Sequence, residues 1–154
     1  MSVQIVLGSK SDMKVAEKAV AVLKELGLKY RLTIASAHRT PELVDKLVAE
    51  ADADVFIAIA GLSAALPGAI AARTTKPVIG VPVSGAVNLD SILSVVQMPP
   101  GIPVAGVGLD RGDNAALLAA EMIGIRDEKV RKALDAYRQK LKDSVIQDSK
   151  EVEV

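Results

Sequence analysis

The sequence contains three turns, two polar and one of small residues, whose residue types could together bind an anion and transfer a proton. The first turn is Gly8-Ser9-Lys10-Ser11-Asp12, which combines a glycine, two hydroxyls and a carboxylate at the predicted start of a helix. Hydroxyls and the free N–H groups of a helix start can bind an anion, and a carboxylate can accept hydrogen bonds from ribose hydroxyls. The turn is not a Walker A loop, because the GxxxxGK[ST] pattern is absent. A purely structural role, in which Ser11 only caps the helix, is an equally good interpretation.

The second polar turn, Ser36-Ala37-His38-Arg39-Thr40-Pro41, carries the single histidine of the chain. An imidazole titrates near neutral pH, so His38 is the one side chain that is ready to act as a general acid and base. A guanidinium beside a helix start, such as that of Arg39, suits bidentate phosphate binding. Thr40 can cap the helix that Pro41 begins. A lone histidine is usually structural, but its place at the end of a strand, between a serine and an arginine, favours catalysis.

The third turn, Ala60-Gly61-Leu62-Ser63-Ala64-Ala65-Leu66-Pro67-Gly68, consists mostly of small residues. Small side chains let a ligand approach the backbone, although close packing between a strand and a helix would explain the pattern as well. Each of the three turns follows a predicted strand, and ligands of open α/β sheets bind at the carboxyl ends of the strands. We therefore expect the three turns to meet at one edge and to bind a phosphate, a ribose and a small polar ring.

The elements that must position these turns follow from the spacing of apolar residues. The predicted strands are 3–7, 30–35, 55–60, 78–83 and 104–109. The predicted helices are 13–26, 41–51, 63–73, 89–97, 114–123 and 127–147, and a charged, frayed tail follows the last one. Strands that alternate with helices indicate right-handed βαβ units and a parallel sheet. Because no linker or change in composition interrupts the pattern, we predict a single α/β domain over residues 1–154.

Composition narrows the classes of function. The chain has 154 residues, of which 50% are hydrophobic, and its formal net charge of zero argues against a general nucleic-acid binder. Because it has no cysteine and one histidine, thiolate catalysis and Cys- or His-based metal sites are excluded, and we expect no metal. It shows neither a signal-peptide pattern nor an apolar run of about 20 residues, so we expect a cytoplasmic protein without a membrane partner. The helix over 114–123 is apolar nearly all round, which predicts that a second copy of the chain covers one of its sides.

Five segments together resemble one enzyme family over nearly the whole chain. They are, in this order, GSKSD, SAHRTP, AGLSAALPG, VQMPPGIPV and NAALLAAEMI. They resemble the purine-biosynthesis family of N5-carboxyaminoimidazole ribonucleotide mutases and aminoimidazole ribonucleotide carboxylases. The resemblance implies a flavodoxin-like, three-layer α/β/α sandwich with a five-stranded parallel sheet and an extra C-terminal helix, assembled as a homo-octamer. It also implies that the chain forms 4-carboxy-5-aminoimidazole ribonucleotide, with a small ribonucleotide and CO₂ as its partners and without a cofactor.

The resemblance also assigns roles to the residues of the three turns. His38 would be the catalytic residue that transfers the proton, and Asp12 would bind the ribose hydroxyls. The residues implied for the phosphate are Ser9, Ser11, Ser36 and Arg39. The residues implied for the pocket of the ring and CO₂ are Gly61, Leu62, Ser63, Ala64 and Leu66. The expected substrate-binding set is completed by Gly8 and Ala37.

One position departs from the pattern of the mutases. The mutases carry a second histidine just before Leu-Pro-Gly in the third turn, associated with the carboxylate of the ligand, whereas this chain has Ala65. The carboxylase branch also lacks that histidine, but it has Ser-Asn-Ala where this chain has Ser63-Ala64-Ala65. The arginine of SAHRTP and the Leu-Pro-Gly are mutase-like. We therefore predict a mutase that moves the carboxylate from the exocyclic amine to ring carbon C4. The alternatives are a carboxylase that takes CO₂ directly and a non-catalytic nucleotide-binding module.

Overall fold

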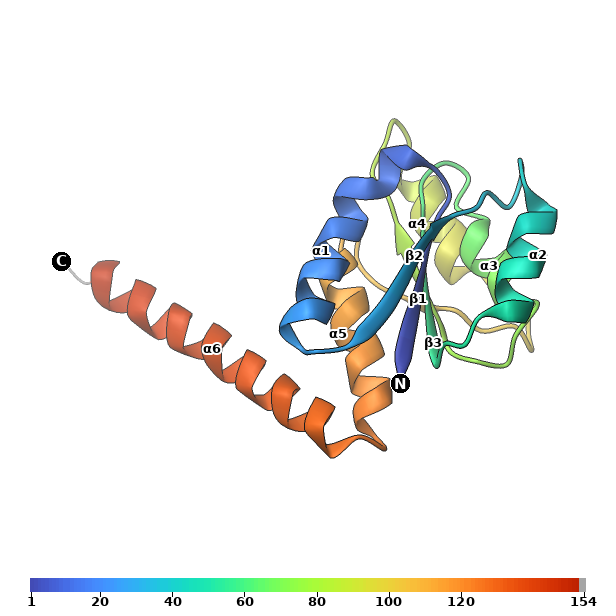
Figure 1. Ribbon diagram of the computed structural model, residues 1–154. Helices are drawn as coiled ribbons and strands as arrows, with labels where there is room; N and C mark the ends of the chain where they lie inside the picture. Colours follow the sequence, from blue (N-terminus) through green and yellow to red (C-terminus); the bar gives the residue numbers. More distant parts are fainter. Residues whose placement is uncertain (153–154) are drawn as a thin grey trace.

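A parallel sheet of five strands forms the centre of the computed structural model, which describes residues 1–152 (Figure 1). The strands are β1 (Ser2–Leu7), β2 (Lys29–Ile34), β3 (Val55–Ala60), β4 (Val78–Pro82) and β5 (Ala105–Gly106). Their order in the sheet is β2-β1-β3-β4-β5. Every residue of β3 is buried, as the uninterrupted apolar run of this strand predicted for a strand covered on both faces. The chain is thus an α/β protein with the predicted parallel sheet.

Helices cover both faces of the sheet and make three layers (Figure 1). One face packs against α1 (Met13–Glu25) and α5 (Gly112–Gly124), and α1 follows a short 3-10 helix, η1 (Lys10–Asp12). The other face packs against α2 (Pro41–Glu50), α3 (Leu66–Ala71) and α4 (Asn88–Val96). The last helix is α6 (Glu128–Val152). Among residues 1–152, no helix combines the length and the hydropathy that crossing a bilayer requires.

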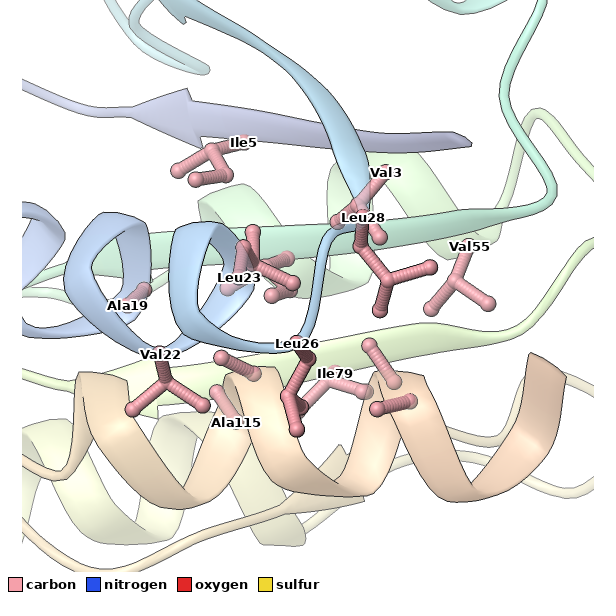
Figure 2. Packing of buried hydrophobic residues seen from close by; sticks show 14 of the residues in the cluster. Val3, Ile5, Ala19, Val22, Leu23, Leu26, Leu28, Val55, Ile79 and Ala115 are labelled. Carbon is pink, nitrogen blue, oxygen red and sulfur yellow. The ribbon is translucent and has the colours of Figure 1, made fainter. Parts of the chain in front are cut away.

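The larger hydrophobic core lies between the sheet and the pair of helices α1 and α5. Figure 2 shows Ile5 of β1, Leu23 of α1, Ile79 of β4 and Ala115 of α5 in one buried cluster between the sheet and the two helices. Alanines on α5 let the two helices and the sheet approach closely. The approach is closest at the start of α5, where a Cβ atom on Gly112 would overlap the backbone of α1. Small aliphatic residues therefore set the spacing of this layer.

Helix α5 is covered on its outer side by α6 of the same chain. The first turns of α6 bury Val130 and Leu134 in the same core, and Tyr137 packs against it. The sequence predicted that a second copy of the chain covers one side of α5. Helix α6 of the same chain therefore covers part of that surface. Beyond these turns, α6 runs away from the sandwich and leaves Leu141 and Val145 exposed (Figure 1). The contact of α5 with a second copy stays a prediction, and the distal part of α6 offers a further apolar surface for such a contact.

Three elements differ most in length from the sequence prediction. Strand β5 pairs with β4 at Ala105 and Gly106 instead of over 104–109, because the chain leaves the strand conformation after Gly106 and reaches a left-handed φ angle of 58° at Asp110. Helix α3 spans 66–71 instead of 63–73, because Pro67 belongs in the first turn of a helix. Helix α6 continues to Val152 instead of ending at 147, because no glycine or proline interrupts it and i,i+4 side-chain bonds support it. Residues 153–154 of the predicted tail lie outside the described residues.

Candidate active site

A polar cleft lies at the carboxyl ends of β1, β2 and β3, where the three turns meet. Strand β1 is flanked by β2 on one side and by β3 on the other, so the chain direction across the sheet reverses there, and such a reversal opens a crevice. The cleft has a volume of about 450 Å³. Its lining residues are Gly8, Ser9, Ser11, Asp12, Ser36, Ala37, His38, Arg39, Ala60, Gly61, Leu62, Ser63 and Leu66.

Almost every residue that the sequence indicated for the site lines this cleft. The exception is Ala64, which is fully buried and lies outside the lining. The lining residue that sequence reasoning missed is Ala60, the last residue of β3. Its position at the carboxyl end of a central strand was the signal that could have indicated it. His38 and the Gly8-Ser9 corner, which come from different turns, therefore lie in one cleft of one chain.

The first loop is closed by its own hydroxyls. The side chain of Ser9 caps η1 by accepting a hydrogen bond from the backbone N–H of Ser11, at 3.1 Å. The two serine hydroxyl oxygens lie 2.8 Å apart, and the hydroxyl of Ser11 donates to Asp12 Oδ1 at 3.3 Å. Ser9 thus caps η1, and α1 begins after Asp12 without a side-chain capping bond, whereas the structural interpretation of the sequence had given the cap of this helix to Ser11. The hydroxyl of Ser11 instead lies between the cap and the carboxylate.

Asp12 is the carboxylate of the cleft, and it is 5% exposed. Burial raises the pKa of Asp12 above its ordinary value, and hydrogen bonds from Ser9 and Ser11 together with the positive charge of Arg39 oppose the rise. Because the pKa is raised overall, desolvation of the charged carboxylate outweighs these interactions. A hydroxyl of a ligand that donates a hydrogen bond to this group would stabilise its charged form.

Arg39 connects the second loop to the first. Its guanidinium donates a hydrogen bond from Nη2 to the carbonyl oxygen of Gly8 at 3.0 Å, and its Nε lies 3.4 Å from the hydroxyl oxygen of Ser36. The backbone N–H of Arg39 also donates to that hydroxyl. These bonds hold the cation of the cleft between the two loops that carry the serines. His38, which precedes it, lies on the same turn.

The hydroxyl of Thr40 closes the second turn instead of bonding to the N–H groups of α2. Its hydroxyl accepts a hydrogen bond from the backbone N–H of Ser36 at 2.9 Å and lies 3.3 Å from the carbonyl oxygen of Ser36. It makes no side-chain capping bond to α2, which begins at Pro41 as predicted. Thr40 is still the N-cap residue of α2 by position, as predicted, and its carbonyl oxygen accepts hydrogen bonds from the backbone N–H groups of Leu43 and Val44. The closed turn presents His38 and Arg39 to the cleft.

The third loop forms the wall of the cleft that carries little charge. Leu62 is 77% exposed at its rim, whereas Leu66 is buried where α3 begins. A Cβ atom on Gly61 would lie 3.8 Å from the Cβ atom and the carbonyl oxygen of Val83, so the next strand end backs this loop. Backbone and small side chains line this wall, which suits a flat ligand group that lies close to the main chain.

Known proteins resemble this chain over its whole length. A family model described as AIR carboxylase matches residues 2–144. A protein of Methanocaldococcus jannaschii named N5-carboxyaminoimidazole ribonucleotide mutase is 57% identical over 149 residues, which are 96% of this chain and 95% of that protein. A relative from Methanobrevibacter smithii is 54% identical over 158 residues, and the chain spans 45% of its length. The crystal structure of Treponema denticola PurE has a TM-score of 0.89 at 33% identity, with 99% of this chain and 98% of that chain covered.

The sheet order, the three layers and the cleft at the reversal point define a flavodoxin-like α/β domain with a polar ligand site. Its relatives include proteins named as mutases, which are isomerases. The chain belongs to the AIR carboxylase family and is an enzyme of purine biosynthesis.

Proposed function

We propose that this enzyme moves a carboxylate from the exocyclic amine of N5-carboxyaminoimidazole ribonucleotide to ring carbon C4, with His38 as the proton shuttle. The observation that carries the proposal is the meeting of His38, Arg39 and Asp12 in one cleft. A relative that is 57% identical carries the name of this activity. Such a reaction needs a cation that binds the phosphate, a carboxylate that binds the ribose hydroxyls and an imidazole that transfers the proton.

The first two loops bind the phosphate and the ribose of the proposed substrate. The bonds of Arg39 to Gly8 and Ser36 use only part of the fork of N–H donors that a guanidinium presents, and the rest can bind phosphate oxygens. The hydroxyls of Ser9 and Ser11 bond to each other, and that of Ser11 also bonds to Asp12, but each can rotate its single proton to donate to the same anion. Asp12 accepts hydrogen bonds from the ribose hydroxyls, which offset the desolvation that raises its pKa.

The third loop holds the ring and the CO₂ that the reaction releases. CO₂ has to stay beside the ring until C4 attacks it, and a wall of backbone and small side chains excludes water from that space. Gly61 and Ser63 line this part of the cleft, and Leu66 closes its base. Fully buried Ala64 supports the wall from behind instead of touching the ligand.

His38 gives one proton to the exocyclic nitrogen and takes one proton from ring carbon C4. Protonated His38 donates a proton to the exocyclic nitrogen as the N–C bond breaks, which releases CO₂ and leaves a nucleophilic aminoimidazole. Ring carbon C4 then attacks CO₂ and forms the new C–C bond. Neutral His38 removes the proton from C4, which restores the aromatic ring. The imidazole ends protonated as it began, so no other reactant is consumed.

A comparison of carboxyl donors tests this proposal. The purified protein is incubated with N5-carboxyaminoimidazole ribonucleotide or with aminoimidazole ribonucleotide plus bicarbonate, and the 4-carboxy product is measured. We expect faster product formation from the N5-carboxy substrate. A wild-type protein that binds aminoimidazole ribonucleotide but forms product from neither donor would support a non-catalytic nucleotide-binding module and would refute the proposal.

The His38→Asn variant tests the role of the imidazole. General acid–base catalysis contributes about 10²–10⁴-fold to a rate, so we expect turnover to fall by that factor. Binding of aminoimidazole ribonucleotide, measured by calorimetry, should stay near the wild-type value and serves as the control for an intact cleft. If turnover survives near the wild-type rate, the proton shuttle is another group.

Ala65 supports a second candidate function, the direct carboxylation of aminoimidazole ribonucleotide by CO₂. The family pattern of the mutases has a histidine at this position, and here a half-buried alanine precedes α3. In the comparison of donors, faster product formation from aminoimidazole ribonucleotide and bicarbonate would establish this second function. The Ala65→His variant should then shift the preference towards the N5-carboxy donor.

The proposed enzyme is a homo-oligomer, and the resemblance implies an octamer. Support comes from the distal part of α6, which leaves the sandwich with exposed Leu141, Val145 and Ile146. Exposed apolar residues that continue the buried stripe of the same helix favour packing on another copy. Light scattering measures the mass, and a monomeric mass would contradict this part of the proposal.

A further inference from the structure

Asp110 has an unusual backbone conformation just beyond β5. Its φ angle is 58°, and among residues 1–152 it is the one non-glycine residue in the left-handed region. Aspartate tolerates this region better than most residues, but glycine would adopt it without cost. The conformation alone therefore does not explain a carboxylate here, and its hydrogen bonds do.

Asp110 binds the end of β4 and the residues just after it at two points. Its backbone N–H donates a hydrogen bond to the carbonyl oxygen of Pro82 at 2.9 Å. Its side-chain Oδ1 accepts a hydrogen bond from the backbone N–H of Ser84 at 2.8 Å. The carbonyl oxygen of Asp110 accepts from Lys18 Nζ of α1 at 3.1 Å, which fixes the other side of the residue. Asp110 thus clamps Pro82 and Ser84, the two neighbours of Val83.

Val83 passes this restraint to the third loop of the cleft. Its backbone N–H donates to the carbonyl oxygen of Ala60 at 3.0 Å. Its Cβ atom and carbonyl oxygen lie 3.8 Å from the position of a Cβ atom on Gly61. Ala60 and Gly61 both line the cleft, whereas Asp110 and Val83 do not. A continuous path of contacts therefore leads from Asp110 to the wall of the cleft.

We propose that Asp110 is a positioning residue of the active site, which holds the wall around Gly61 in place through the Pro82–Ser84 segment. The inference rests on the proposed function, in which this wall retains CO₂ beside the ring. Ser84 is partly exposed, so water can replace the lost acceptor and the fold loses little stability. The consequence of losing the carboxylate is a looser wall, from which CO₂ escapes before C4 attacks it.

Two substitutions at Asp110 separate its carboxylate from its backbone conformation. Asp110→Gly keeps the left-handed conformation but removes the acceptor for the Ser84 N–H. Asp110→Asn keeps both, because the amide oxygen can accept the same hydrogen bond and asparagine also tolerates this conformation. Ser84→Pro removes the donor from the other side of the bond and leaves Asp110 untouched. Asp54→Ala is the matched control, because Asp54 accepts a bond from the N–H of Ser2 at 2.7 Å, at the amino ends of the strands.

Hydrogen exchange tests the clamp without depending on the reaction. In the ligand-free protein, Asp110→Gly and Ser84→Pro should speed amide exchange over 60–63, measured by mass spectrometry, whereas Asp110→Asn and Asp54→Ala should match the wild type there. Wild-type exchange over 60–63 in Asp110→Gly would overturn the inference. Because this measurement needs no substrate, it separates a failure of the clamp from a failure of the proposed function.

Partitioning of the N5-carboxy substrate tests the consequence for the reaction. Asp110→Gly should convert more substrate to free aminoimidazole ribonucleotide and CO₂, and its kcat should fall roughly threefold to thirtyfold, the range expected for a residue that acts through others. Asp110→Asn should restore the wild-type partition. A lower thermal midpoint with an unchanged partition and kcat would show a merely structural role and overturn the inference. A wild-type protein that does not convert the substrate would refute the proposed function instead.

Discussion

Replacement of Arg39 by alanine tests the assignment of the phosphate site most directly. The guanidinium lies between the first two loops, and its bonds to Gly8 and Ser36 hold it in the cleft without using all its donors. Loss of a hydrogen bond to a charged group costs about 1.5–3 kcal/mol. Because about 1.4 kcal/mol corresponds to a factor of ten, Arg39→Ala should raise the Kd of aminoimidazole ribonucleotide by roughly ten- to a hundredfold.

The same substitution removes the bond to Gly8, but this bond is exposed at the rim of the cleft. We expect it to lower the free energy of unfolding by only about 1 kcal/mol. Arg39→Lys keeps the charge and loses the planar fork, so it should recover only part of the affinity. The effect on binding is therefore larger than the effect on the fold.

Calorimetry measures the loss of phosphate binding with two ligands. They are aminoimidazole ribonucleotide and the corresponding nucleoside, which lacks the phosphate. Arg39→Ala should weaken binding of the first and leave that of the second almost unchanged. The matched control is Arg111→Ala, because Arg111 follows the last strand, is paired with Asp113 at 3.1 Å and does not line the cleft. An unchanged Kd for the ribonucleotide, or an equal loss for both ligands, would show that the phosphate binds elsewhere.

Two further substitutions have expected outcomes that follow from the structure. Gly112→Ala should lower the free energy of unfolding by about 1–3 kcal/mol, because the new Cβ atom would overlap the backbone of Val15. Denaturant titrations measure this loss. The control is Gly85→Ala, whose Cβ atom would meet nothing within 4 Å. Asp12→Asn should raise the free energy of unfolding at pH 7, because burial raises the pKa of Asp12 and the charged form destabilises the fold. That advantage should shrink as the pH falls towards about 4, where protonation of the carboxyl removes the charge from the folded chain. A constant difference from pH 4 to pH 8 would contradict this explanation.

The sequence predicted the order and type of the elements because local patterns specify them. The uninterrupted apolar run of β3 and the helical spacing of α1 are properties of a few consecutive residues. The place of the site also followed from the sequence, since parallel strands put all their carboxyl ends at one edge. His38 and Arg39 could therefore be assigned to the same site as Ser9 before any coordinates were known.

Contacts between distant segments could not be predicted in this way. The hydroxyl of Thr40 closes its turn on Ser36 instead of capping a helix, and this choice depends on the three-dimensional path of the turn. Whether Ala60 or Ala64 reaches the cleft depends on how α3 packs beneath the loop, because both are small residues in the same turn. The short pairing of β5 likewise depends on the three-dimensional path of the chain after Gly106.

The sequence by itself determined the parallel α/β sheet, the edge at which the three loops meet and the chemical groups of the site, because hydrophobic periodicity and the direction of parallel strands are local properties. Only the tertiary structure decided that the guanidinium of Arg39 binds Gly8, that Asp12 is buried with a raised pKa and that Asp110 holds Ser84. Hydrogen bonds and desolvation depend on distances of a few ångströms between residues far apart in the chain, and no spacing along the sequence specifies those distances.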